Sequence, residues 1–248
     1  MRILISNDDG YQADGIIQLA KSLSEIAEVI VVGPSENKSA ASSSLTIGKP
    51  LKPIQIENNV YAINATPSDC VHLALCGFIK EPIDLDVTGI NFGANLGDDV
   101  IYSGTVAGAI EGRFLGLPSI ALSLASWECN HFDTAGKIAK ILVEQIDKAP
   151  LSNSTIINVN VPDIPMHEIM GIKTTRMGSR LKSASSIQDS KNPSLFWIGE
   201  NGKEADNVEG TDFHAVSNNY VSVTPLQIDL TKYSEVDKLS IWLDNINF

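Results

Sequence analysis

The sequence predicts an α/β protein built on a doubly wound, mostly parallel sheet. Short runs of Ile, Val and Leu recur along the first two thirds of the chain, and stretches with helical spacing of apolar residues separate them. Runs that are apolar throughout are typical of strands buried on both faces of a parallel sheet. The repeated order strand, helix, strand therefore favours a doubly wound arrangement.

The individual elements follow from local patterns. Apolar residues recur at helical spacing from Ile16 to Ile26 and from Ala135 to Ile146. A third helix is expected after Thr66, because Thr66-Pro67-Ser68-Asp69 supplies an N-cap hydroxyl, a proline at the first helical position and a carboxylate three residues after the cap. Five strands are expected, at Ile3–Ser6, Val29–Val32, Leu85–Ile90, Ser119–Leu124 and Ile156–Val161.

Two segments interrupt this alternation. Residues 50–63 predict an inserted antiparallel β-hairpin, with two apolar runs on either side of Glu57-Asn58-Asn59. From about residue 176 the composition shifts to polar loops with short strands. We therefore expect a core at 1–175 and a C-terminal β/α extension at 176–248, within one structural domain overall.

The extension is too polar to enclose a core of its own. Its strands are expected at Leu195–Ile198 and Tyr220–Val223, and its last stretch, Glu235–Ile246, carries apolar residues at helical spacing up to the end of the chain. Apolar residues on such a stretch need a surface to cover them. We expect this terminal helix to pack on the core and on a partner subunit.

Composition and charge exclude several classes of function. The 248 residues contain 18 Lys and Arg against 30 Asp and Glu, a net charge of −12 that repels nucleic acid and anionic membranes, so neither is an expected partner. No apolar run reaches the length of a membrane span or a signal peptide. The three cysteines show no metal-binding or redox spacing, which indicates reduced thiols and a cytoplasmic protein.

Two adjacent carboxylates, Asp8 and Asp9, follow the first predicted strand in the sequence SNDDG. In an open parallel sheet, ligands bind beyond the carboxyl ends of the strands, so this position faces a site. Paired carboxylates repel each other unless a cation neutralises them, and Mg²⁺ and Mn²⁺ prefer oxygen ligands. The alternative interpretation is that one Asp caps the helix starting near Gly15 while the other is solvated.

A glycine-rich and asparagine-rich stretch follows the strand Leu85–Ile90, in the sequence GINFGANLGDDVIYSGTVAGAIEG. Ser103-Gly104-Thr105 opens a helix within it, and a helix N-terminus offers free N–H groups and a positive dipole to an anion. The spacing matches neither of the common nucleotide-binding glycine loops. The stretch therefore predicts a phosphate site, with a tight strand-to-helix connection as the alternative.

The loop after the second strand, GPSENKSAASSS at residues 33–44, is rich in hydroxyl side chains. Composition alone indicates a flexible polar loop. Because it leaves the same edge of the predicted sheet, it could also supply a hydroxyl ligand or a lid.

These motifs together resemble the SurE family of stationary-phase survival proteins. The resemblance is carried, in order along the chain, by MRILISNDDG, VVGPSENKSAASSSLT, TPSDCVHLAL, the glycine-rich block, NVNVP and TDFHAVSNNYVSVTPL. It implies a Rossmann-like fold and a divalent-metal-dependent phosphatase acting on nucleoside 5′- and 3′-monophosphates, often with exopolyphosphatase activity. It also implies dimers or tetramers that exchange C-terminal elements.

The resemblance also implies the residues of the site. One Mg²⁺ or Mn²⁺ per subunit would be bound by Asp8, Asp9, Ser39 and Asn91, with Asp8 and Asp9 also catalytic. The substrate phosphate would be bound by Asn95, Ser103, Gly104 and Thr105. The chain departs from the family at Ala65, where a glycine is usual, and at Ser35-Glu36 in the hydroxyl-rich loop; neither change removes a proposed ligand.

Two rival classes fit less well. A haloacid-dehalogenase-type phosphatase has Asp-x-Asp after its first strand, whereas this chain has adjacent aspartates followed by glycine, and a receiver-type signalling module needs an Asp where this chain has Asn91. A noncatalytic module that binds nucleotide or phosphate through an acidic Mg²⁺ site is the main alternative to an enzyme, because binding and hydrolysis share residues.

Overall fold

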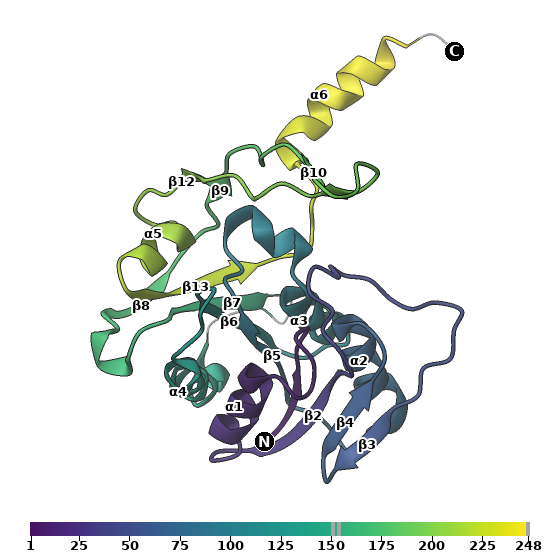
Figure 1. The fold of residues 1–248 in the computed structure, drawn as a ribbon, viewed down its shortest axis with the longest axis vertical. Coiled ribbons are helices and arrows are strands. Elements are labelled where there is room, and N and C mark those ends of the chain that lie inside the picture. Colours follow the sequence, from purple (N-terminus) through teal and green to yellow (C-terminus); the bar gives the residue numbers. More distant parts are fainter. Residues whose placement is uncertain (150–151, 153–154, 247–248) are drawn as a thin grey trace.

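The computed structural model describes residues 1–149, 152 and 155–246 of the chain. The central sheet of this part has nine strands, drawn in Figure 1. In chain order they are β1 (Arg2–Ser6), β2 (Glu28–Pro34), β3 (Ile54–Glu57), β4 (Val60–Ile63), β5 (Leu85–Phe92), β6 (Ser119–Ala125), β7 (Ile156–Pro162), β8 (Gly171–Thr174) and β13 (Tyr220–Leu226).

The strands lie in the order β3-β4-β2-β1-β5-β6-β7-β13-β8. The six from β4 to β7 run parallel, while β3 and β13 run antiparallel to their neighbours β4 and β7. The chain builds outward from β1 in one direction and then continues with β5 on the other side, so the order reverses between β1 and β5. Ligands of doubly wound folds bind at such a switch point, beyond the carboxyl ends of the strands.

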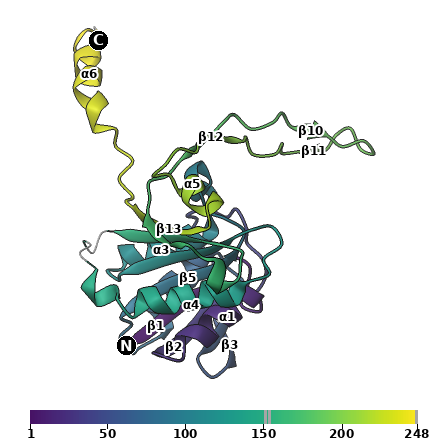
Figure 2. The same cartoon turned by 90° about the vertical axis from the view of Figure 1, so that its left-hand side faces the viewer.

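Helices cover both faces of the sheet (Figures 1 and 2). One face carries α1 and α4, which pack against each other, and the other carries α2 and α3. The strands between them are almost wholly apolar and buried, as in β1, where Ile3, Leu4 and Ile5 are 0% exposed. The helices are α1 (Asp14–Leu23), α2 (Pro67–Leu73), α3 (Gly104–Phe114), α4 (Phe132–Val143), α5 (Asp212–Ser217) and α6 (Tyr233–Asp244).

Most elements of the core are confirmed. The five predicted strands correspond to β1, β2, β5, β6 and β7, and the hairpin at 50–63 is the antiparallel pair β3 and β4. Helix α2 has the expected capping box, in which the Thr66 hydroxyl accepts from the Asp69 N–H and the Asp69 carboxylate accepts from the Thr66 N–H. Ala65 does not adopt a positive φ, so an alanine there causes no strain.

The C-terminal part is more closely integrated than its composition indicates. Residues 220–226 enter the central sheet as β13, between β7 and β8, whereas the sequence predicts only a short strand in the extension. The remaining short strands are β9 (Ser179–Arg180), β10 (Ile187–Gln188), β11 (Phe196–Trp197) and β12 (Glu204–Asp206). Strands β10 and β11 form an antiparallel arm that reaches away from the body (Figure 2).

The terminal helix differs from the prediction that it packs on the core. Helix α6 projects from the body in both views (Figures 1 and 2), and it contains no buried residue. Its apolar side chains, such as Leu239 and Ile241, are 54% and 65% exposed. Among the described residues, no helix is long and apolar enough to cross a membrane.

Candidate active site

The acidic pair lies at the end of β1, beside the switch point. The turn is shaped by Asn7, whose side-chain amide donates to the Gly10 carbonyl at 2.8 Å. Asp8 is 4% exposed, and Asp9 is partly buried. Neither caps the following helix, because α1 begins after Ala13 without a side-chain cap. The alternative interpretation of the pair as a cap with a solvated neighbour is therefore wrong.

Asp8 is oriented by the first turn of α3. The Thr105 hydroxyl donates to Asp8 Oδ1 at 2.5 Å. Gly104 lies so close that a Cβ there would be 2.7 Å from Asp8 Cβ and 2.8 Å from Oδ2. Burial raises the pKa of Asp8 to about 6, although the Thr105 hydroxyl and the Gly104 N–H lower it, and the charge of Asp9 raises it further. A cation beside this carboxylate would relieve that burial cost.

Asp9 faces the carboxyl end of β5. Its Oδ2 accepts the backbone N–H of Phe92, the last residue of this strand, at 3.0 Å; burial raises the pKa of Asp9, and this hydrogen bond lowers it. Also at this strand end, Asn91 donates its amide to the Gly93 carbonyl at 2.8 Å, which leaves its Oδ1 without a donor among the described residues. Asp8, Asp9 and Asn91 therefore present oxygen atoms at the carboxyl ends of two adjacent strands.

The hydroxyl-rich loop reaches the acidic pair through its backbone. The Lys38 N–H donates to the Asp8 carbonyl at 2.7 Å. Ser39 follows directly, with its N–H bonded to Asn37 Oδ1 at 2.7 Å, and its side chain is exposed. The structure thus brings this loop beside Asp8, while the role of Ser39 as a metal ligand stays a prediction.

Three of the four predicted phosphate residues, Ser103, Gly104 and Thr105, form the start of α3, and both of their hydroxyl groups are already engaged. The Ser103 hydroxyl caps the helix by accepting the Val106 N–H at 3.1 Å, and the Thr105 hydroxyl binds Asp8. The N–H of Thr105 has no acceptor among the described residues. An anion would therefore be bound by the backbone and dipole of this helix end, with the side chains holding its shape.

Asn95 is fixed by residues that the sequence-based site does not include. Its backbone N–H donates to Asn160 Oδ1, and its carbonyl accepts from the amides of Asn158 and Asn160, at 2.8 to 2.9 Å. Its side-chain amide donates to the Ser123 hydroxyl at 2.8 Å. The signal for the two asparagines was present in NVNVP, as polar residues inside a strand that otherwise reads as buried.

The site predicted from the sequence also omits Asp212, which links the C-terminal part to the glycine-rich loop. Its carboxylate is fully buried and accepts backbone N–H bonds from Gly97, Gly178 and Phe213, at 2.7, 2.8 and 2.9 Å. Arg180 adds an ion pair with Asp99 at 2.6 Å in the same loop. The loop that leads into α3 is therefore held by C-terminal residues that lie 81 and 115 positions away in the sequence.

The acidic pair carries no basic partner in the described part of the chain. That part also contains no cluster of three or more His, Cys, Asp or Glu side chains placed to hold a metal ion. The predicted donor set agrees with this, because only two of its four members are carboxylates. The other two, Asn91 and Ser39, supply neutral oxygens.

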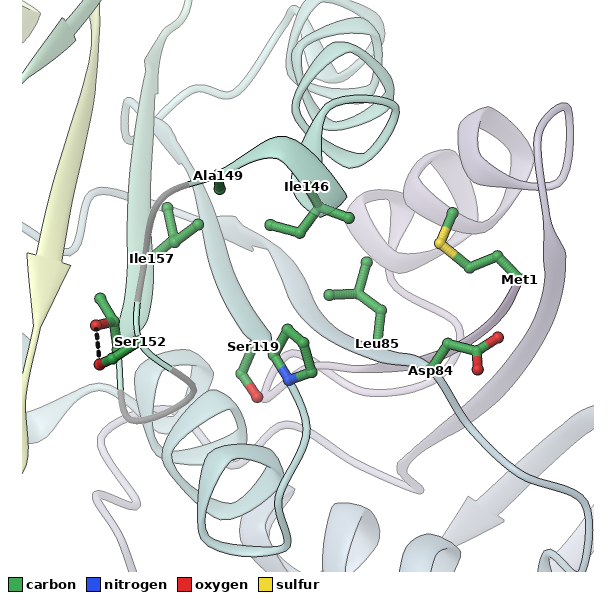
Figure 3. Close-up of a pocket in the computed structure, with 10 residues that line it drawn as sticks. Met1, Asp84, Leu85, Ser119, Ile146, Ala149, Ser152 and Ile157 are labelled. Carbon is green, nitrogen blue, oxygen red and sulfur yellow. Dashed lines mark hydrogen bonds between the residues drawn. The ribbon is translucent and has the colours of Figure 1, made fainter.

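A separate pocket of about 480 Å³ lies at the opposite edge of the sheet (Figure 3). Its walls include Met1, before the first strand, and Leu85 and Ser119, the first residues of β5 and β6. These positions are at the amino ends of the strands. The pocket is therefore distinct from the crevice that contains Asp8 and Asp9.

Comparisons with known proteins agree with the motifs. The family model described as "Survival protein SurE" matches residues 3–184. A protein of Ruthia magnifica subsp. Calyptogena magnifica named "5'-nucleotidase SurE" is 70% identical over 246 residues, covering 99% of this chain and 100% of the relative. A protein of the same name from Haemophilus influenzae is 51% identical over 246 residues, with 98% of both chains covered.

The fold has a solved counterpart. The crystal structure of the SurE protein from Aquifex aeolicus superposes with a TM-score of 0.88 at 39% identity, covering 99% of this chain and 100% of that one. The match thus extends past the region of the family model and includes the C-terminal part. From the matched family model and these relatives, the chain belongs to the SurE family.

Proposed function

We propose that this protein is a divalent-metal-dependent phosphatase that hydrolyses nucleoside 5′- and 3′-monophosphates to nucleoside and phosphate, with exopolyphosphatase activity as a further reaction of the same site. The observation that carries the proposal is the contact between the acidic pair and the start of α3, where Thr105 bonds to Asp8. A cation site and an anion site thus adjoin at the switch point of the sheet. The name 5'-nucleotidase SurE of the relatives supports the 5′-monophosphate substrates.

The residues present fit a hard cation. Asp8 is buried and Asp9 is partly buried, both without a basic partner in the described chain, and the Oδ1 of Asn91 has no donor among the described residues. Carboxylate, amide and hydroxyl oxygens are the ligands that Mg²⁺ and Mn²⁺ prefer. We propose one such ion per subunit, bound by Asp8, Asp9, Asn91 and Ser39.

The chain's own residues would bind and orient the phosphate. The Thr105 N–H and the positive end of the α3 dipole stabilise charge on the phosphoryl oxygens. Ser103, Gly104 and Asn95 fix the shape of this phosphate site. Thr105 holds the Asp8 carboxylate in one orientation toward the reacting group. When bound, the cation supplies Lewis acidity toward a phosphoryl oxygen and lowers the pKa of a coordinated water.

The test is phosphate release from nucleoside 5′- and 3′-monophosphates and from polyphosphate, with Mn²⁺ or Mg²⁺ and with EDTA. Wild type and Asp8→Asn are compared, and circular dichroism checks that the variant folds. We expect turnover that requires metal and falls by at least about 100-fold in Asp8→Asn. Metal and nucleotide binding without turnover would favour the noncatalytic binding module instead.

We also propose that the protein is a homodimer or homotetramer built through its C-terminal extension, and that it is cytoplasmic. The exposed apolar residues of α6 and of the β10–β11 arm, among them Trp197 at 64% exposure, support a self-association surface. The three free cysteines, two of them buried, suit a reducing compartment. Light scattering of the full chain and of a variant ending at residue 232 tests the assembly; a monomer across micromolar concentrations would contradict it.

A further inference from the structure

Two exposed aromatic side chains stand beside the acidic pair. Trp127 is 85% exposed and Phe92 is 43% exposed. Phe92 is the last residue of β5, and Trp127 lies two residues after the end of β6. These are adjacent parallel strands, paired through Phe92 and Leu124. Both aromatic residues therefore lie at the edge of the sheet where ligands bind.

The indole of Trp127 lies over Gly93, which directly follows the end of β5 that carries the predicted metal ligand Asn91. A Cβ on Gly93 would be 3.5 Å from Trp127 Cζ3 and 3.8 Å from Cε3 and Cη2, so the six-membered ring covers this glycine. The Gly93 carbonyl accepts the Asn91 amide, and the Phe92 N–H donates to Asp9. The aromatic pair is thus connected to the acidic pair through one short loop.

The loop that carries Trp127 is well defined. The Asp163 carboxylate accepts the N–H groups of Asn130 and His131 at 2.7 to 2.9 Å, and the Ser126 hydroxyl accepts the N–H of Glu128 at 3.0 Å. The indole is therefore presented to solvent by a hydrogen-bonded loop. A large aromatic face held in this way beside a polar site suits a flat ring from a ligand.

We propose that Trp127, with Phe92 on the same side, forms a stacking platform for the base of a nucleoside monophosphate. This inference rests on the proposed function. The phosphate lies on the Asp8 side of the pair, against Thr105, and the base lies on the Asp9 side, with the sugar spanning the two. Stacking does not read base edges, so all bases bind, and the larger purine ring binds more tightly than a pyrimidine.

A second exposed aromatic residue directly precedes the predicted phosphate site and is an alternative stacking surface. Tyr102 is 66% exposed and directly precedes the helix cap Ser103. Stacking on Trp127 and stacking on Tyr102 predict that different substitutions weaken nucleotide binding, so mutagenesis distinguishes them. Trp197 on the distant arm, at 64% exposure, offers a matched control for loss of an exposed tryptophan.

The experiment measures KM and kcat of wild type, Trp127→Ala, Tyr102→Ala and Trp197→Ala with adenosine and cytidine 5′-monophosphates and with ribose 5-phosphate, which has no base. We expect Trp127→Ala to raise KM for the adenosine substrate roughly 10-fold, the range of one base–aromatic stack, and to leave ribose 5-phosphate within twofold. Trp197→Ala, which removes a residue of the proposed self-association surface, should leave the ratio of KM for adenosine 5′-monophosphate to KM for ribose 5-phosphate as in wild type. The inference would be contradicted if Trp127→Ala raised KM equally for all substrates, or if only Tyr102→Ala raised KM for the nucleotides.

A binding measurement keeps the inference testable if no substrate is turned over. In a Trp197→Phe/Trp242→Phe background, Trp127 is the remaining tryptophan of the sequence. Adenosine 5′-monophosphate with Mn²⁺ should quench its fluorescence, and ribose 5-phosphate should not. Quenching without turnover would contradict the proposed hydrolysis and support the platform, whereas turnover without quenching would contradict the platform alone.

Discussion

Replacing Gly104 with alanine tests whether the start of α3 sets the position of Asp8. A Cβ at Gly104 would lie 2.7 Å from Asp8 Cβ, about 0.7 Å inside the 3.4 Å at which ordinary contact begins. The clash involves the base of the Asp8 side chain, which cannot swing away as a flexible end could. Asp8 must therefore shift by up to about 1 Å, and such a misplacement costs on the order of 100-fold in rate, about 2.7 kcal/mol of transition-state stabilisation.

The assay is phosphate release with saturating Mn²⁺, together with calorimetric measurement of Mn²⁺ affinity. Overpacking costs about 1–3 kcal/mol of stability, so the variant should stay folded well below its melting temperature. Gly77→Ala is the matched control, because the nearest atom to its Cβ is Leu73 Cδ2 at 3.8 Å. A Gly104→Ala enzyme with metal affinity and kcat within twofold of wild type would refute the reasoning.

Three further predictions concern the buried polar groups. Asp212→Ala leaves three buried backbone donors unpaired and should lower the free energy of unfolding by about 3 kcal/mol in urea titrations. Asp212→Asn keeps one acceptor oxygen and should lower the free energy of unfolding by less. Equal losses in the two variants would show that these hydrogen bonds do not cause the loss of stability. Mn²⁺ at 100 times its Kd should stabilise wild type by about 2.7 kcal/mol, which is measured as a higher Tm, and should stabilise Asp9→Asn less. The same rise of Tm in both proteins would exclude Asp9 as a metal ligand. Asp86 is fully buried with both oxygens unpaired, and burial and Glu111 raise its pKa well above the ordinary value. The folded state thus keeps a proton on Asp86 that the unfolded state releases. The contribution of this proton to the free energy of unfolding is complete below about pH 4 and is lost as the pH rises toward the folded-state pKa of Asp86. Asp86→Asn should therefore make the decline of the free energy of unfolding with pH shallower, and an unchanged slope would contradict this.

The sequence identified the parallel core because its strands are short runs rich in Ile, Val and Leu, a composition that suits burial on both faces and is visible without information from elsewhere in the chain. The same holds for α2, where Thr66 and Asp69 are three residues apart and close the capping box locally. Local patterns of this kind are read directly from the order of residues.

The candidate site was predictable to the extent that its parts follow the ends of strands. The acidic pair after β1 and Asn91 near the end of β5 lie at the same edge because parallel strands place their carboxyl ends together. Ser39 entered only through family resemblance, since nothing in its own sequence environment distinguishes it from the neighbouring serines.

The tertiary structure alone decided how the site is supported. The contact of Thr105 with Asp8 spans 97 positions and that of Asp212 with Gly97 spans 115. No local pattern encodes which distant partner a buried polar residue will meet, because any donor can satisfy any acceptor and only the packing of the chain selects the pair. The sequence by itself thus determined the parallel strands of the core, the helices that cover them and the edge at which the chemistry gathers. Only the folded chain determined the place of β13 in the central sheet and which groups orient Asp8, hold the glycine-rich loop and present Trp127 to solvent.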